Sequence, residues 1–248
     1  MSHTVGWMPE LIRRLKEACA ESFVFATVDL DQRLPAGKQL CLELWPFIRE
    51  LPLNIQAVRE KMPRASSNLD GANKLLSVLA DEEHLYQRLY LKQCVLAGLS
   101  ESAVLNTAAS SRAIRLASLM NAFCQDSTYA DGVYAIVAAE LAATAFARCA
   151  LPWFEEYFRS NSNRLDSSMG ASINESMIDE GLAWLRHHAK PHLRQAIWMR
   201  RMLEEIEKET EHNPTGEPLE MIISAVFEIL EVPQIERSKR VKDAVLKY

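Results

Sequence analysis

The sequence predicts an all-α protein, a single helical bundle of seven to eight helices. The chain has only eight glycines in 248 residues, below the average share of about 7%, which disfavours a fold with many tight hairpins. Both Asp-Gly pairs, at 70–71 and 131–132, lead into helical patterns rather than standing between alternating strands. Helix start signals recur along the chain. We expect one domain over residues 1–248, with 213–248 as a peripheral C-terminal helical appendage.

The first half of the chain contains three predicted helices with identifiable ends. An N-terminal helix is expected over about 8–27, and a second from Pro35 to about residue 60. The third covers 71–97 and is closed by Gly98. Ser100 is placed to cap the helix that follows.

The second half begins with Thr128 and Asp131, which resemble a capping box for a helix to about residue 159. The polar, glycine-containing segment 160–172 is predicted to be a loop.

The last long helix is expected to begin at a second capping box, formed by Ser172 and Glu175, and to run to about residue 209. Pro218 and Pro233 suit the first turns of two short final helices.

The composition argues against several classes of protein. With 28 basic and 33 acidic residues the net charge is −5, and no basic stripe points to nucleic acid. Five widely spaced cysteines without a C-x-x-C pair are neither a disulfide framework nor a zinc ribbon. The longest apolar stretch, 132–147, is too short to span a bilayer, and the N-terminus lacks a signal-peptide pattern. We therefore expect a cytoplasmic protein with no membrane partner.

Glu140 is the only charged residue in that apolar stretch, and it lies on the apolar stripe. Burying a lone carboxylate is costly unless a partner compensates it. Glu140 is therefore expected to form a salt bridge to another helix, to bind a metal, or to stay protonated.

The stretch "LADEEHLYQRLY" places Asp81 three residues before His84, so both side chains can reach one point beside a helix. A carboxylate-x-x-His pair on facing helices is how helical bundles build iron and manganese sites. Glu82 falls among apolar residues, and the pattern leaves open whether Asp81, Glu82 or Glu83 partners His84. The alternative is a solvated helix face.

Three of the six histidines stand in "LRHHAKPHLRQ". His188 and His192 are four residues apart and share a helix face, and neutral imidazole suits iron, zinc, copper or nickel. His187 points elsewhere and is interpreted as an ordinary surface residue. The pair could equally be structural.

Four stretches together resemble the haem-oxygenase-like helical superfamily, which includes TenA thiaminases, pyrroloquinoline-quinone synthases and non-haem di-iron oxidases. They are "LCLELWPFIRELPLNIQAVREKMPRA", "DEEHLYQRLYLKQCVLAGLS", "AIVAAELAATAFARCALPWFEEYF" and "WLRHHAKPHLRQAI". The resemblance implies a non-haem iron-dependent oxidase, with one or two irons and no haem, that activates O2 on a small-molecule substrate. It also implies a homodimer. The metal ligands implied by position are Asp81, Glu82, His84, Glu140, His188 and His192. His192 stands where the oxidases have Asp, and Gln195 where they have a second His.

Two alternatives remain open. The chain could be a metal-free pocket enzyme like the quinone synthases or TenA proteins, with histidines and Tyr86, Tyr90 and Tyr134 at the site. The thiaminase branch uses a cysteine beside a Pro–aromatic stretch, whereas here "LPWFEEY" follows Cys149 by a turn, and Cys149 is interpreted as a buried apolar residue. The chain could also be a non-catalytic member that binds a ligand or a partner through a degenerate site.

Overall fold

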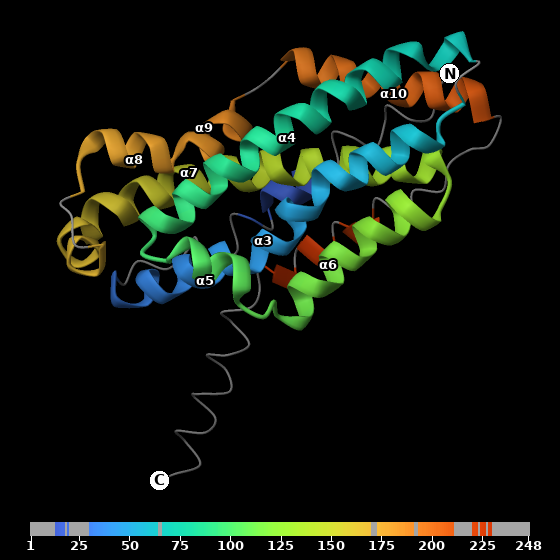
Figure 1. The fold of residues 1–248 in the computed structure, drawn as a ribbon. Coiled ribbons are helices and arrows are strands. Elements are labelled where there is room, and N and C mark those ends of the chain that lie inside the picture. The colour runs from blue at the N-terminus through green and yellow to red at the C-terminus, as the bar shows by residue number, and fades with distance from the viewer. Residues whose placement is uncertain are drawn as a thin grey trace.

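The computed structural model describes residues 13–17, 19, 30–63, 66–169, 173–190, 193–210, 220–222, 224–226 and 228–229. These residues form helices and short connections, without a strand among them, so the predicted all-α class is confirmed. Figure 1 shows the long helices side by side in a bundle.

Helices α3 (Leu30–Lys61) and α4 (Asp70–Leu96) pack against each other, joined through the short 3-10 turn η2 (Ser67–Leu69). The predicted stop after α4 is confirmed, because Gly98 has φ 83 and its N–H donates to the Val95 carbonyl at 2.9 Å. This left-handed conformation is one that glycine adopts without the Cβ penalty of other residues.

The next helical region is two helices, α5 (Glu101–Asn106) and α6 (Ser111–Asn121), followed by the π-helical turn η3 (Ala122–Asp126). Ser100 caps α5 as expected, its side chain accepting from the Ala103 N–H, and Ser110 caps α6 in the same way. Two Ser caps ten residues apart explain why the chain turns between the two helices.

Helix α7 (Tyr129–Met169) forms the centre of the bundle and contacts α3, α6, α8, α9 and α10. The expected capping residues are confirmed: the Thr128 hydroxyl accepts the Asp131 N–H at 3.2 Å and donates to its carboxylate at 2.7 Å. The loop predicted over 160–172 is wrong for 160–169, which is helical. That segment is polar but lacks a glycine or proline before Gly170, so nothing in its backbone chemistry ends the helix.

The single helix predicted over 172–209 is three helices, namely α8 (Glu175–Gly181), α9 (Ala183–Ala189) and α10 (Leu193–Thr210). Asn174 caps α8, its side chain accepting from the Met177 N–H, while the predicted cap Ser172 lies outside the described residues. Lys190 is extended (φ −66, ψ 135), as expected for a residue that precedes a proline.

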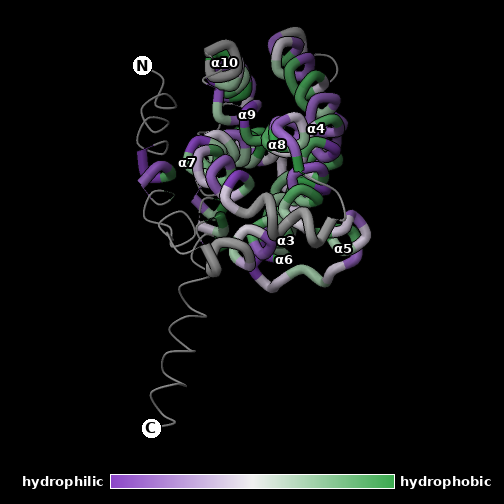
Figure 2. The backbone as a smooth tube through the Cα atoms, turned by 90° about the vertical axis from the view of Figure 1, so that its left-hand side faces the viewer, coloured by the Kyte–Doolittle hydropathy of each residue, from purple (hydrophilic) through white to green (hydrophobic). Residues whose placement is uncertain are grey.

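The hydrophobic core includes part of the C-terminal region, which we expected to be peripheral. Ile222, Ala225, Val226 and Ile229 are buried in the same core as α7, so this part of the segment packs against the bundle. Figure 2 shows polar and apolar segments alternating along α4, as in an amphipathic helix with one buried face. The stretch Tyr129–Ser160 of α7 has the length and hydropathy of a membrane span, but 78% of the window that meets this test is buried inside the fold, as in the core helix of a soluble protein.

Candidate active site

Two acidic side chains are buried deep in the bundle, one on α4 and one on α7. Glu83 of α4 is 3% exposed and Glu140 of α7 is 2% exposed. Burial raises the pKa of Glu83 well above its ordinary value of 4.5, and the nearby charges of Glu140 and then Glu82 raise it further. Ionising two nearby carboxyl groups that are both buried away from water costs a large free energy. One of the two therefore retains its proton at pH values where exposed carboxyl groups have lost theirs.

The buried face of α4 explains why Glu83 is the residue that enters the site. The side chains on this face follow the helical spacing of three and four residues, and they are Leu76, Leu79, Glu83, Tyr86 and Tyr90. Asp81, Glu82 and His84 are all exposed, so the structure does not bring these three predicted ligands to Glu140.

The apolar residues around Glu82 in the sequence do not form one buried face; they are Leu75, Val78, Leu79, Leu85, Tyr86 and Leu89. Val78 and Leu85, which suggested that Glu82 faces the core, are 42% and 48% exposed, whereas Leu75, Leu79 and Tyr86 are buried.

His188 of α9 lies in the same region, 6% exposed. Its ring contacts Trp184, with centroids 4.4 Å apart, and meets the Tyr86 ring edge-on at 5.1 Å. His188 Nδ1 lies 3.0 Å from the Trp184 carbonyl oxygen. A carbonyl oxygen only accepts, so Nδ1 carries the hydrogen and Nε2 is the basic nitrogen of the neutral ring.

Tyr86 of α4 contacts His187 of α9, and the charges of Glu83 and Glu140 act on it. Its hydroxyl lies 2.5 Å from His187 Nε2, and the two rings are 4.4 Å apart. Burial raises the pKa of Tyr86, and the charges of Glu82, Glu83 and Glu140 raise it further, so the phenol keeps its proton in its hydrogen bond with His187. His187 was interpreted from the sequence as an ordinary surface residue; its side chain is half-buried and is hydrogen-bonded to Tyr86.

These residues form one unit, which we name the acid–histidine cluster: Glu83, Tyr86, Glu140, Trp184, His187 and His188. Of the predicted site residues, the structure brings Glu140 and His188 together near Tyr86. His192 lies outside the described residues. Among the described part of the chain, no group of three or more His, Cys, Asp or Glu side chains is arranged to hold a metal ion.

An apolar cavity adjoins the cluster at Trp184. It is lined by Leu44, Phe47, Ile48, Leu116, Ala139, Ala142, Ala143, Phe146, Trp184, Val226 and Ile229. Its volume of about 30 Å³ holds only one or two water-sized groups. A larger molecule can bind there only if some of the lining side chains move. Trp184 Nε1 is buried without a hydrogen-bond partner among the described residues, which makes it a donor available to a bound molecule.

The arrangement of helices matches solved structures. A TenA homologue from Pseudomonas syringae pv. tomato str. DC3000 superposes with a TM-score of 0.60, covering 91% of this chain and 88% of that chain at 15% identity. The chain has a TenA-like fold. A TenA homologue from P. horikoshii OT3 covers 90% of this chain and 97% of its own at 12% identity, with a TM-score of 0.43. No protein-family model matches the sequence, and no curated protein matches it with significance.

Within this TenA-like fold, Cys149 is remote from the acid–histidine cluster. It follows Glu140 by nine residues, or two and a half helical turns, so it lies on the opposite face of α7. There it is hydrogen-bonded to the buried thiol of Cys19, which lowers the pKa of Cys149 to about 7. Cys149 was interpreted as a buried apolar residue; it packs against the core but is only half-buried.

Proposed function

We propose that this chain is a pocket enzyme that transfers protons on a small, mostly apolar molecule at the acid–histidine cluster. The observation that carries the proposal is the buried pair of Glu83 and Glu140, whose environment raises the pKa of Glu83. Pairs of titratable groups with environments that separate their pKa values are typical of acid–base active sites.

The two carboxylates would supply an acid and a base, one of them protonated and the other ionised. The protonated member donates to the substrate while the ionised member accepts, and general acid–base catalysis of this kind contributes about 10²- to 10⁴-fold in rate. Glu83 is the candidate for the protonated member because its pKa is raised.

Tyr86 and His187 provide a route by which the cluster exchanges its proton with solvent. Tyr86 is buried, whereas His187 is half-buried, and the two side chains are hydrogen-bonded. A proton that leaves the carboxylate pair can thus reach the surface through one phenol and one imidazole.

The substrate class follows from the cavity beside the cluster. Its walls are almost entirely apolar, and Trp184, whose buried N–H has no hydrogen-bond partner among the described residues, is one of them. The cavity would suit an apolar molecule with one carbonyl group, because the carbonyl oxygen could accept a hydrogen bond from the buried Trp184 N–H. Proton abstraction beside that carbonyl is the reaction that the cluster is equipped to assist.

An iron-dependent oxidase that uses O2 is the second candidate. A divalent cation between Glu83 and Glu140 would compensate their charges as a proton does. The described residues do not supply a third ligand, so this candidate requires His192. The donor set among the described residues does not fit a metal ion.

Deuterium incorporation from D2O tests proton transfer on a range of candidate substrates at once. Small apolar carbonyl compounds are incubated with the protein and followed by mass spectrometry, with and without a chelator. We expect incorporation that survives the chelator, falls at least 100-fold in Glu83→Gln and Glu140→Gln, and persists in Glu82→Gln. Glu82 is the matched control because it is adjacent to Glu83 but exposed. Equal activity in Glu83→Gln and Glu82→Gln would refute the assignment, and turnover that requires both Fe(II) and O2 would favour the oxidase.

We further propose a cytoplasmic homodimer. All five cysteines are free thiols, which suits a reducing compartment. Light scattering coupled to size-exclusion chromatography tests the dimer directly.

A further inference from the structure

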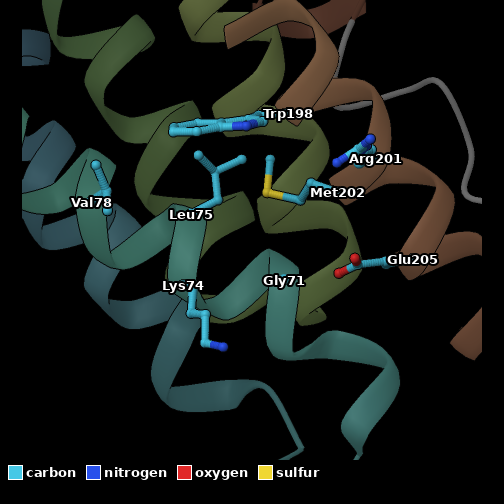
Figure 3. A pocket seen from close by; sticks show the side chains of 8 residues that line it. All are labelled: Gly71, Lys74, Leu75, Val78, Trp198, Arg201, Met202 and Glu205. Carbon is cyan, nitrogen blue, oxygen red and sulfur yellow. The ribbon is translucent and has the colours of Figure 1, made fainter. Parts of the chain in front are cut away.

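A second cleft lies between the first half of α4 and helix α10, away from the acid–histidine cluster. Its lining residues are Gly71, Lys74, Leu75, Val78, Trp198, Arg201, Met202 and Glu205, and its volume is about 260 Å³ (Figure 3). None of these residues belongs to the cluster. The volume suits a molecule of one or two rings, slightly smaller than the usual range of about 300–1,000 Å³ for ligand sites.

The base of the cleft is apolar, and most of its side chains are buried. Leu75 is 8% exposed and Met202 is 1% exposed, while Trp198 is half-buried. Figure 3 shows the indole ring of Trp198 lying across the side chains of Leu75 and Met202. A half-buried indole beside aliphatic side chains offers a flat surface on which an aromatic ring can stack.

Two cations stand on opposite walls of this cleft, Lys74 on α4 and Arg201 on α10 (Figure 3). Both are exposed, and neither has a hydrogen bond or ion pair to another residue in the described part of the chain. The neighbouring Arg200, in contrast, is paired with Glu204 at 2.9 Å. In a chain with a net charge of −5, two uncompensated cations at one cleft favour an anionic ligand.

The one acidic residue of the cleft is already engaged. The Glu205 carboxylate accepts the backbone N–H of Ala72 at 2.8 Å and so caps the N-terminus of α4. A Cβ at Gly71 would lie 2.4 Å from Glu205 Oε1, so glycine at this position permits the close approach. This contact fixes α10 against α4 and holds the cleft open in a defined shape.

We propose that the α4–α10 cleft binds a planar aromatic carboxylate. Its ring stacks on Trp198 above Leu75 and Met202, and its carboxylate is held by Lys74 and Arg201. Charge-assisted hydrogen bonds from these two side chains provide the selectivity for an anion, and the apolar base of the cleft provides the selectivity for a ring. This site is independent of the proposed proton transfer, because the two sites share no residue.

Isothermal titration with 2-naphthoate, and with uncharged 2-naphthamide for comparison, tests the proposal. We expect the full-length protein to bind 2-naphthoate at least tenfold more tightly than 2-naphthamide, with the difference shrinking as salt is added. In Lys74→Gln/Arg201→Gln the affinity for 2-naphthoate should fall at least tenfold, and in Arg200→Gln it should be unchanged. Trp198→Leu should weaken both ligands.

The proposal is overturned if the wild-type protein does not bind 2-naphthoate. It is also overturned if the double variant, shown by circular dichroism to be folded, binds as tightly as the wild type. A change of oligomeric state in the double variant, with no naphthoate bound to the wild type, would instead assign the cleft to contact with a second copy of the chain.

Discussion

Replacing Glu83 by Gln should stabilise the protein at neutral pH, although it changes one of the most buried polar residues in the core. Glu83 is 3% exposed, and its pKa is raised above 4.5 by burial, then by Glu140 and Glu82. A carboxyl with a raised pKa in the folded state loses its proton more readily in the unfolded state. The stability associated with Glu83 is therefore fully present below about pH 4.5 and is lost as the pH rises through the folded-state pKa.

The size of the effect follows from proton linkage. Stability falls by about 1.4 kcal/mol for each pH unit between the two pKa values. Because pH 7 lies about 2.5 units above the unfolded-state pKa, the loss at pH 7 is at most about 3.5 kcal/mol. Glutamine keeps the shape and a donor but has no ionisable proton. We expect Glu83→Gln to recover up to about 3.5 kcal/mol at pH 7, or a melting temperature higher by up to roughly 10 °C.

Urea unfolding followed by circular dichroism at pH 5, 6, 7 and 8 measures this effect. The gain in Glu83→Gln should grow with pH, and the control Glu82→Gln should stay within about 0.5 kcal/mol of the wild type because Glu82 is exposed. A Glu83→Gln protein that is less stable than the wild type at pH 7 would refute the reasoning. It would mean that Glu83 is ionised and paired, and the same titration in chelator would then show whether a cation is its partner.

Three further predictions concern other parts of the fold. Gly98→Ala should destabilise the protein by about 1–2 kcal/mol in urea unfolding, because φ is 83 at the end of α4. Asn54→Ala should cost about 2–3 kcal/mol in the same assay, because the buried amide is hydrogen-bonded to one side chain of α6 and one of η3. Alkylation of Cys149 by iodoacetamide should accelerate as the pH rises through about 7, where its thiolate forms, and Cys19→Ala should move this midpoint upward by removing the thiol that stabilises the thiolate. Mass spectrometry of the labelled peptide reads out the rate, and an unchanged midpoint in Cys19→Ala would contradict the pairing.

Several helix ends were predictable because they carry local chemistry. Ser100, Gly98 and the Thr128–Asp131 pair act through hydrogen bonds or backbone conformation within a few residues, and each has the predicted role. The break between α9 and α10 was missed although Pro191 marks it in the sequence. The histidine pattern was interpreted as continuing through the proline, whereas the residue before a proline is driven out of helical geometry.

The site was predictable in part. Glu140 could be found because a lone charge in a long apolar run must be compensated wherever the helix packs. Glu83 could not be separated from Glu82, because exposed Val78 and Leu85 made the wrong helix face look apolar. The signal that identifies Glu83 is its spacing from Tyr86 and Tyr90, which share its face. His187 was missed because its partner Tyr86 lies 101 residues away in sequence, and such contacts leave no local pattern.

The central claim is that Glu83 holds a proton beside Glu140 in the resting protein at neutral pH. Infrared difference spectroscopy measures it most directly, because a protonated carboxyl has a C=O stretching band that carboxylates lack. The account predicts such a band at pH 7 in the wild type and in Glu82→Gln, and its loss in Glu83→Gln. A wild-type spectrum without the band, or a band that persists in Glu83→Gln, would contradict the assignment of Glu83 as the buried acid.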